Sequence, residues 1–264
     1  MALLNSARGG KIPVKLILGA GIILFALFKY WGNTDKNPWT GRSQHITIEP
    51  AQEIALGLQS APQMAEQFGG LYPDQQLQKK IDEIGQRLVK NSIASQTPYT
   101  YDFHLLRDPQ TVNAFALPGG QVFITYGLLS RLKNEDQLAG VLGHEIGHVI
   151  GRHSAERMAK QNLTRGVVNG VLVGSDGGYG AAQTTAMIAN MINMSYGRED
   201  ELESDDLGVM IMIDAGYNPE ELIGVMEILR EASGGQRVPE FQSTHPSPDN
   251  RIQKIKEAIR KYRK

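Results

Sequence analysis

Residues 144–148 read His-Glu-Ile-Gly-His, and this stretch decides which kind of domain the chain can form. His144 and His148 are four residues apart, so on a helix both imidazoles lie on one face, one turn apart, and can bind the same metal ion. Glu145 lies beside them and can reach a water molecule on that ion. Zinc lowers the pKa of such a water to about 7, and a glutamate can then take its proton. The stretch predicts one zinc ion per chain, with His144 and His148 as ligands and Glu145 as the general base.

The residues around this stretch favour a buried helix over a solvated helix that happens to carry two histidines. A buried polar group needs a partner, which a metal ion supplies. Gly143 and Gly147 each weaken a helix by about 1 kcal/mol. We therefore expect another backbone to pack closely against the helix at these glycines. The remaining positions near the motif are apolar: Val141, Leu142, Ile146, Val149 and Ile150.

A third zinc ligand must come from elsewhere, because catalytic zinc usually has three protein ligands and a water. A metzincin would place a histidine at the position of Ser154, whereas His153 comes one residue early, about 100° away around the helix. The chain has no cysteine. The third ligand is therefore expected to be a carboxylate, and the candidates lie in the acidic run at residues 199–206.

Two pairs in this run have the i, i+4 spacing that would offer one ligand and one acceptor for a ligating imidazole. Glu201 and Asp205 form one pair, and Asp205 would then orient His144. Glu199 and Glu203 form the rival pair, and an ordinary charged helix start is a third interpretation. Spacing alone leaves these alternatives open.

The hydrophobic pattern of the remaining chain predicts a mostly helical α+β domain with a small β-sheet. Asp74 and Asn134 are expected N-caps, and the Gly-rich segment 165–180 is expected to form a loop or a mobile segment near the site. Strands are expected at residues 99–106, 112–117 and 121–125. Helices are expected at residues 50–68, 74–93, 135 to beyond 153, 181–194, 199–215, 219–232 and 248–262.

The N-terminus has the pattern of a membrane anchor. Residues 12–31 would form about 30 Å of helix, the thickness of a bilayer core. We expect residues 1–31 to be an uncleaved single-pass anchor that contacts the membrane through 12–31; a cleaved signal peptide or a buried soluble helix are the alternatives. We expect the short N-terminal tail to stay in the cytoplasm. The large domain would then lie outside the cytoplasm, on the periplasmic side in a bacterium. Residues 32–49 are expected to be a linker, and residues 50–264 the zinc metallopeptidase domain.

Composition excludes several classes of function. Lys+Arg total 27 and Asp+Glu total 28, whereas nucleic-acid binders carry a basic excess, so we expect no nucleic-acid partner. The absence of cysteine excludes disulfides, thiol catalysis and cysteine-ligated zinc.

Residues 74–261 resemble the zinc metallopeptidases that include the CAAX prenyl protease, the HtpX heat-shock protease and the BepA-type periplasmic proteases. The resemblance rests on His-Glu-Ile-Gly-His followed by Arg152-His153, on Glu201 to Asp205 as an E-x-x-x-D motif, and on residues 244–252 as a late His-Pro motif. It implies a zincin-like domain in which Glu201 is the third zinc ligand and Asp205, the aspartate of the motif, lies behind the ligands and accepts a hydrogen bond from a ligating imidazole. The family more often has alanine where this chain has Ser204.

The resemblance also implies roles for two further segments. His245 matches a histidine near the metal that would stabilise an oxyanion or bind zinc in a resting state, and Arg251 would help to hold that loop. A His-Pro turn that only caps the last helix is the structural alternative. A sheet edge would bind substrate in an extended form, with a purely structural hairpin as the alternative; its residues are Asn113, Ala114, Phe115 and Ala116.

The predicted function is zinc-dependent endopeptidase cleavage of proteins. Because one span is predicted, the chain resembles the anchored or soluble branch, which acts on misfolded or envelope proteins, and not the relatives with several spans. Two alternatives are kept. One is a chaperone-like binder of unfolded chains whose protease site is latent, and the other is an anchored structural domain without metal.

Overall fold

The computed structural model describes residues 13–174, 197–232, 241, 244–245 and 250–263. The expected helix at 181–194, residues 175–180 of the expected loop and the first residues of the expected helix at 248–262 lie outside this part. The helices are α1 (Val14–Gly32), α2 (Pro50–Gln67), α3 (Gln75–Lys90), the short 3-10 helix η1 (Ile93–Gln96), α4 (Tyr126–Leu129), α5 (Glu135–Ile150), α6 (His153–Gly174), α8 (Arg198–Asp214), α9 (Glu221–Ala232) and α11 (Arg251–Tyr262). The strands are β1 (Thr34–Lys36), β2 (Ser43–His45), β3 (Asp102–Leu106), β4 (Ala114–Ala116) and β5 (Gln121–Thr125).

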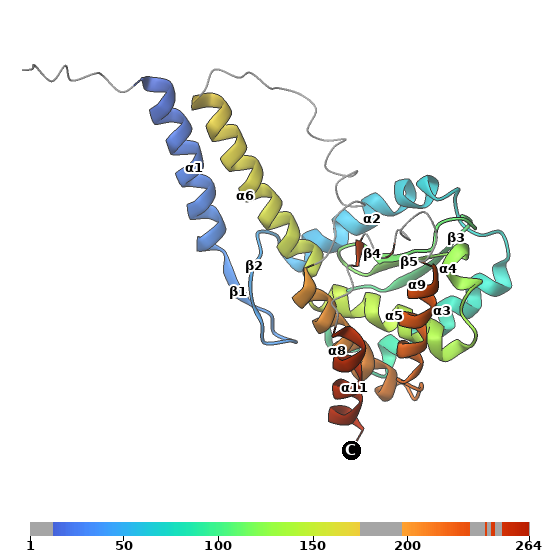
Figure 1. The fold of residues 1–264 in the computed structure, drawn as a ribbon. Helices are drawn as coiled ribbons and strands as arrows, with labels where there is room; N and C mark the ends of the chain where they lie inside the picture. The colour runs from blue at the N-terminus through green and yellow to red at the C-terminus, as the bar shows by residue number, and fades with distance from the viewer. Residues whose placement is uncertain (1–12, 175–196, 233–240, 242–243, 246–249, 264) are drawn as a thin grey trace, which may run out of the picture.

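The predicted fold class, a mostly helical α+β domain with a small sheet, is confirmed (Figure 1). The main sheet has the order β3-β5-β4, with β3 parallel and β4 antiparallel to the central strand β5. Successive side chains of a strand point to opposite faces. Val122 and Ile124 therefore join the core shared with α3 and α5, whereas Phe123 joins Met64 and Phe68 at the end of α2. The sheet thus lies between α2 on one face and α3 with α5 on the other.

The helix that carries the His-Glu-Ile-Gly-His stretch, α5, packs closely against α8. A Cβ atom at Gly147 would lie 2.9 Å from the carbonyl oxygen of Ser204, and one at Gly208 would lie 3.2 Å from the backbone nitrogen of His144. Only glycine allows the two backbones to approach this closely. The expected close packing of a second backbone at these glycines is confirmed, and it brings the acidic run of α8 to the histidines.

Two sequence predictions near this helix are wrong. The helix does not continue past His153, because Arg152 has a φ of 54° and ends it, so that α6 begins in a new direction at His153. The expected Gly-rich loop is helical as far as Gly174, the C-terminal end of α6. Glycine lowers helix propensity, but packing against α1 stabilises the helix here. A Cβ atom at Gly170 would lie 2.7 Å from the carbonyl oxygen of Gly19.

The segment predicted as a linker, residues 32–49, instead forms a β1–β2 hairpin that packs on the end of α5. The buried side chains of Asn37 and Gln44 donate hydrogen bonds to the carbonyl oxygens of Ile150 (2.8 Å) and Gly151 (2.6 Å). The last carbonyl groups of a helix lack partners within that helix. The polar composition that suggests a linker therefore serves to complete a helix end.

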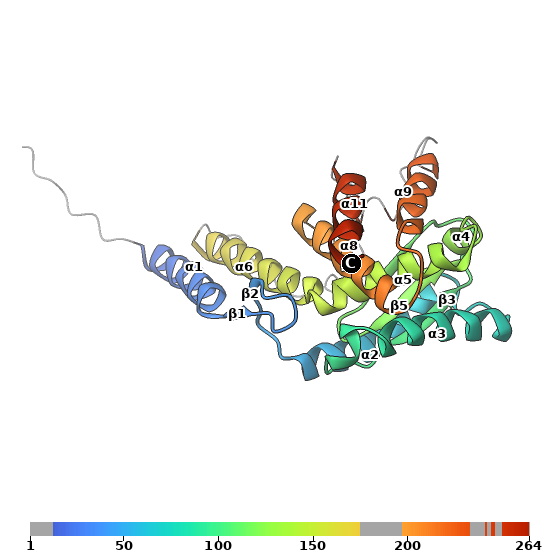
Figure 2. The same ribbon diagram turned by 90° about the horizontal axis from the view of Figure 1, so that it is seen from below.

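Helix α1 lies beside α6 in both views, and the pair projects away from the rest of the molecule (Figures 1 and 2). Only 6% of the most apolar window of α1 is buried, and in length and composition α1 is the one helix of the described part that could cross a membrane. This finding supports the expected anchor without fixing its topology.

Candidate metal centre

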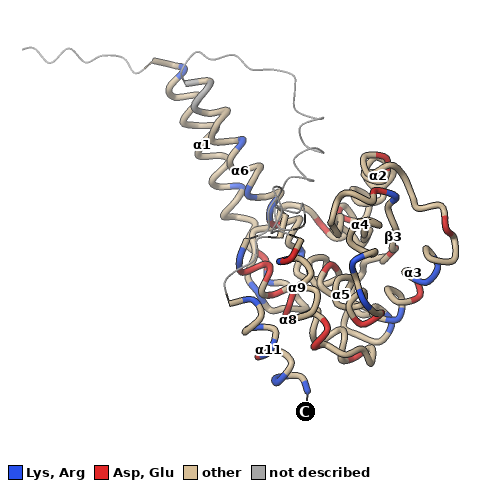
Figure 3. The backbone as a smooth tube through the Cα atoms, turned by 45° about the vertical axis from the view of Figure 1, so that its right-hand side comes forward, with Lys and Arg blue, Asp and Glu red and all other residues tan. Residues whose placement is uncertain are grey.

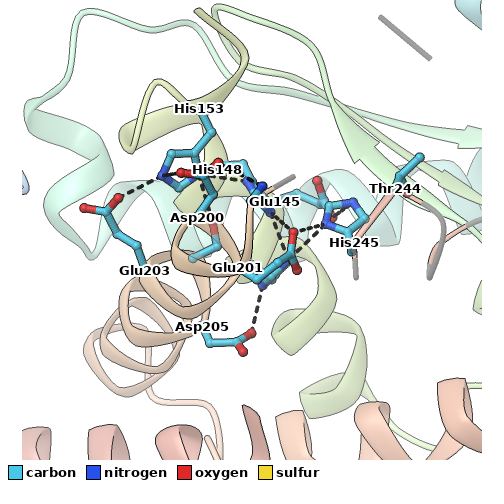
Figure 4. A network of polar contacts seen from close by, with 12 residues as sticks. Glu145, His148, His153, Asp200, Glu201, Glu203, Asp205, Thr244 and His245 are labelled. Atoms are coloured by element: carbon cyan, nitrogen blue, oxygen red, sulfur yellow. Dashed lines mark hydrogen bonds and ion pairs between the residues drawn. The ribbon is translucent and has the colours of Figure 1, made fainter. Parts of the chain in front are cut away.

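Four buried side chains from three parts of the chain converge on one point. His144 and His148 come from α5, Glu201 from α8, and His245 from the segment before α11; one donor atom of each lies within 4.8 Å of all the others. The Nε2 atoms of His144 and His148 are 3.1 Å apart, and Oε1 of Glu201 lies 3.4 Å from Nε2 of His148 (Figure 4). Two ligands on a tetrahedral zinc ion, each about 2.1 Å from it, lie about 3.4 Å apart. The donor spacing is therefore close to that of a small ion's coordination shell.

A hydrogen bond to Asp205 fixes the orientation of His144. Its Nδ1 lies 3.0 Å from Oδ1 of Asp205, and an ionised carboxylate only accepts, so Nδ1 carries the proton. In the neutral form of His144 the lone pair then lies on Nε2, which faces the cluster. Burial and Arg251 lower the pKa of His144, but Asp205 and Glu201 outweigh them and raise it to about 9. A metal ion bound here must displace a proton from His144, so its affinity falls with falling pH.

A second chain of contacts orients His148, and the sequence analysis did not predict it. Nε2 of His153 lies 2.8 Å from the carboxylate of Glu203 and donates to it. With that proton on Nε2, Nδ1 of His153 can accept from Nδ1 of His148 at 2.9 Å, which leaves the lone pair of His148 on Nε2. Arg42 of the β1–β2 hairpin completes the chain, 3.2 Å from Glu203. Figure 4 shows His153 between Glu203 and His148.

The sequence predicted, on the assumption of a continuous helix, that His153 points away from the metal. His153 is indeed not among the four residues whose donor atoms converge. The break in the helix at Arg152 instead brings the ring of His153 to Nδ1 of His148, the nitrogen that faces away from the cluster. Pairing of Glu203 with His153 could not be read from spacing either, because the two residues belong to different helices. The only signal in the sequence is the pair Arg152-His153 that follows the motif.

Arg251, at the start of α11, holds both carboxylates of the E-x-x-x-D motif. It is buried and forms a two-pronged ion pair with Asp205, at 2.6 and 2.9 Å, while its Nη1 lies 3.1 Å from Glu201. Burial raises the pKa of Glu201, but His245 and Arg251 outweigh it and hold that pKa well below its usual range. Glu201 therefore stays ionised, as a metal ligand must be.

Glu145 is buried, and neither of its carboxylate oxygens has a hydrogen-bond partner among the described residues. Nε2 of His245 lies 3.7 Å from one of them. Burial raises the pKa of Glu145. An unpartnered carboxylate in a protein interior is costly, and a metal ion with its water beside the cluster would supply the missing partners. The donor set of imidazoles and a carboxylate also has the chemistry that zinc accepts, so these residues fit a metal ion.

His245 is held in place by Phe241. Its backbone nitrogen donates to the carbonyl oxygen of Phe241 at 2.7 Å, and the two rings stack 4.4 Å apart. Nδ1 of His245 lies 3.0 Å from Glu201 and 3.4 Å from Nε2 of His144. In this conformation His245 stands in the donor cluster itself and not to one side of it.

Strand β4 forms an edge of the sheet in the described part of the chain and contacts α5. The main-chain nitrogen of Leu117 donates to the carbonyl oxygen of Gln121, and the carbonyl oxygen of Asn113 accepts from the nitrogen of Thr125, both in β5. Because such groups alternate along a strand, those of Ala114 and Ala116 point to the edge that no described strand pairs with, although both residues are buried. Asn113 is buried, and its Oδ1 has no hydrogen-bond partner among the described residues. Phe115, the remaining residue predicted to bind substrate, instead packs within the sheet, since its ring stacks on Phe123.

The structure thus brings Glu201 to the imidazoles, whereas the two residues of the alternative pair, Glu199 and Glu203, lie away from the cluster. Glu203 contacts His153, and Glu199 is exposed. Arg251 and Asp205 lie directly behind the ligand cluster. Spacing could not separate the two candidate pairs, because only the packing of α8 on α5 decides which face of α8 points toward the histidines.

The sequence is similar to those of known proteins. The sequence matches the family described as Peptidase family M48 over residues 75–259. The "Beta-barrel assembly-enhancing protease" of Yersinia pestis is 32% identical over 227 residues, which are 83% of this chain and 46% of that protein, so the chain spans about half of its length. The "Mitochondrial metalloendopeptidase OMA1" of Saccharomyces cerevisiae is 30% identical over 256 residues, 90% of this chain and 72% of that protein. The chain therefore belongs to peptidase family M48.

Proposed function

We propose that the protein is a zinc-dependent endopeptidase, with His144, His148 and Glu201 as the metal ligands. The observation that carries the proposal is the convergence of their three donor atoms, all buried, next to Glu145, a carboxylate without a hydrogen-bond partner in the described residues. Zinc bound to these residues would polarise the scissile carbonyl and lower the pKa of a water to about 7. Membership of a peptidase family and the name of the yeast relative support the same reaction.

Glu145 takes the proton of the attacking water and returns it to the leaving amine. A general base works best when its pKa lies near the working pH, and burial moves the pKa of Glu145 upward, in that direction. Asp205 and His153 keep the two imidazoles in the tautomer whose lone pairs face the cluster. Arg251 holds Glu201 in its ionised form.

The substrate binds as an extended chain along the edge of β4 that no described strand pairs with. The outward main-chain groups of Ala114 and Ala116 pair with the substrate backbone, and the buried amide of Asn113 supplies a further acceptor. Recognition through the main chain depends little on side chains. It therefore suits unfolded segments of many sequences, in accord with a role on misfolded or envelope proteins.

The chain is divided into an N-terminal anchor (1–31) and a metallopeptidase domain (50–264), with the domain outside the cytoplasm. The apolar helix α1 supports the anchor, and the relatives of this family include a mitochondrial enzyme and one named for β-barrel assembly. The hairpin between the two parts packs on the domain and belongs to it structurally.

The variant Glu145→Gln tests the reaction. It keeps the size and burial of the side chain but cannot accept the proton, so cleavage of an unfolded protein such as casein should fall at least 100-fold, the usual contribution of a general base. Zinc content should stay at one ion per chain. The matched control is Glu199→Gln, an exposed residue of α8, which should cleave normally. Undiminished cleavage by Glu145→Gln would refute the assignment.

A second candidate, a chaperone-like binder with a latent protease site, is favoured by the position of His245. Its Nδ1 stands in the cluster, where it would occupy the fourth position on a metal and leave no place for water. We expect His245→Ala to cleave casein faster than the wild type. A loss of cleavage with normal zinc content would instead assign His245 to oxyanion stabilisation.

A further inference from the structure

The C-terminal half of α6 leaves the domain in the company of α1. Near its start, α6 packs on the domain, where Ala155 and Met158 share a small core with Ile46. Further along, a Cβ atom at Gly166 would lie 2.4 Å from that of Ala26, and one at Gly170 would lie 2.5 Å from a side-chain carbon of Ile23. The two helices therefore run antiparallel, in backbone contact at two glycines one turn apart.

Neither helix covers the outward faces of this pair. On α1, Leu24, Phe25 and Phe28 are 65%, 67% and 76% exposed, and on α6, Val168 and Val173 are 49% and 40% exposed. An apolar surface of this kind on a projecting element is typical of a site that is covered by a partner or a membrane.

Charge is placed in agreement with a bilayer. Residues 166–174 read Gly-Val-Val-Asn-Gly-Val-Leu-Val-Gly, with no ionisable side chain, and Arg165 precedes them. On α1, Lys29 lies three residues from Ala26, the contact of Gly166, so both basic residues fall near one level of the pair. Figure 3 shows the outer part of the pair almost entirely in tan, the colour of uncharged residues. Basic residues at the ends of a membrane segment reach the headgroups with their long side chains.

We propose that residues 166–174 of α6 enter the bilayer beside α1, so that two helices and not one hold the protein in the membrane. The inference rests on the proposed anchor, because a helix in contact with Gly19 and Ile23 of a spanning α1 lies at the same depth. Nine residues of helix rise about 13 Å, which is a little under half of the roughly 30 Å hydrocarbon core. Gly170 contacts Gly19 and Ile23, which lie on either side of the middle of the expected span 12–31. The segment therefore extends past the bilayer midplane. Its one polar residue, Asn169, lies only about 6 Å along the helix from Arg165.

This arrangement ties the metal centre to the membrane through one helix. His153, which contacts the ligand His148, is the first residue of α6. Gly166 lies 13 positions after His153 in the sequence, which corresponds to about 20 Å of helix. The candidate centre would therefore stand no further than about this distance from the bilayer surface, within reach of protein segments that emerge from the membrane.

Because the chain contains no cysteine, single cysteines can report depth. The full chain is placed in phosphatidylethanolamine–phosphatidylglycerol vesicles with a polarity-sensitive fluorophore at Val168→Cys or Val173→Cys. Phe25→Cys in α1 reports the anchor, and Lys90→Cys, exposed on the domain, reports the aqueous phase. Lipids with a spin label in the acyl chain should quench residues 25, 168 and 173 several-fold more than residue 90.

The outcomes separate the two proposals. Quenching at residue 25 without quenching at 168 and 173 overturns the insertion of α6 and leaves the anchor intact. Absence of quenching at all three overturns both. A disulfide between two Val168→Cys chains, without lipid quenching, would assign the face to a second copy of the protein and also overturns the proposal.

A substitution at the helix contact gives a second measurement. Gly170→Leu cannot fit against α1, so quenching at residue 168 should fall while quenching at residue 25 persists. Gly21→Leu is the matched control, because a Cβ atom there has no neighbour within 4 Å, and it should leave both signals unchanged. Equal quenching at residue 168 in Gly170→Leu and wild type would show that α6 does not depend on α1 for its position, against the proposal.

Discussion

Replacing His153 with alanine tests whether the contacts behind His148 tune the metal centre. His153 is 1% exposed, accepts from His148 at 2.9 Å and donates to Glu203 at 2.8 Å. Without it, the buried N–H of His148 has no fixed acceptor, and the imidazole can adopt the other tautomer or rotate. Loss of such a partner typically lowers metal affinity 10–100-fold, equal to about 1.4–2.8 kcal/mol at 1.4 kcal/mol per tenfold change.

The assay is competition for zinc between the full-length chain and a chelator of known affinity, together with thermal unfolding of the metal-free protein. His153→Gln should recover part of the affinity, because its amide offers one acceptor and one donor. Lys160→Ala is the matched control, since it removes only an exposed partner of Glu156 on the same helix, and it should bind zinc normally. If His153→Ala is folded and binds zinc within twofold of wild type, the reasoning is refuted.

Three further predictions concern the ligand, the helix contact and acid stability. Glu201→Ala should bind zinc far more weakly than Glu199→Ala, whose side chain is exposed; equal affinities in chelator competition would exclude Glu201 as a ligand. Gly147→Val should lower the free energy of unfolding by about 1–3 kcal/mol, because its Cβ would lie 2.9 Å from the carbonyl oxygen of Ser204, and denaturant titration measures this change. Burial raises the pKa of Asp108, but hydrogen bonds from Thr111 and the backbone outweigh it and lower the pKa below its usual value. Asp108 thus stabilises the fold above about pH 4, the ordinary range of an aspartate, and this contribution is lost as the pH falls through the lowered pKa. The stability difference between wild type and Asp108→Ala should therefore shrink in acid, and a constant difference would contradict this account.

Much of the local structure followed from the sequence. The four-residue spacing of His144 and His148 is a property of any helix, so their common face did not depend on the rest of the fold. The caps are equally local: Asp74 accepts from the backbone nitrogens of Gln76 and Leu77, and Asn134 accepts from that of Gln137. The three strands of the main sheet and most helices were also predicted, with bounds within a few residues of those in the structure for most of them.

The tertiary structure alone decided which groups surround the histidines. Residue spacing gave Glu201–Asp205 and Glu199–Glu203 equal standing, because both pairs share a helical period and the choice depends on how α8 packs on α5. The contact of Arg42 with Glu203 joins residues 161 positions apart, and no periodic pattern encodes such a pair. For the same reason the helical state of residues 165–174 was missed, since the glycines that argue against a helix in isolation are those that allow α6 to touch α1.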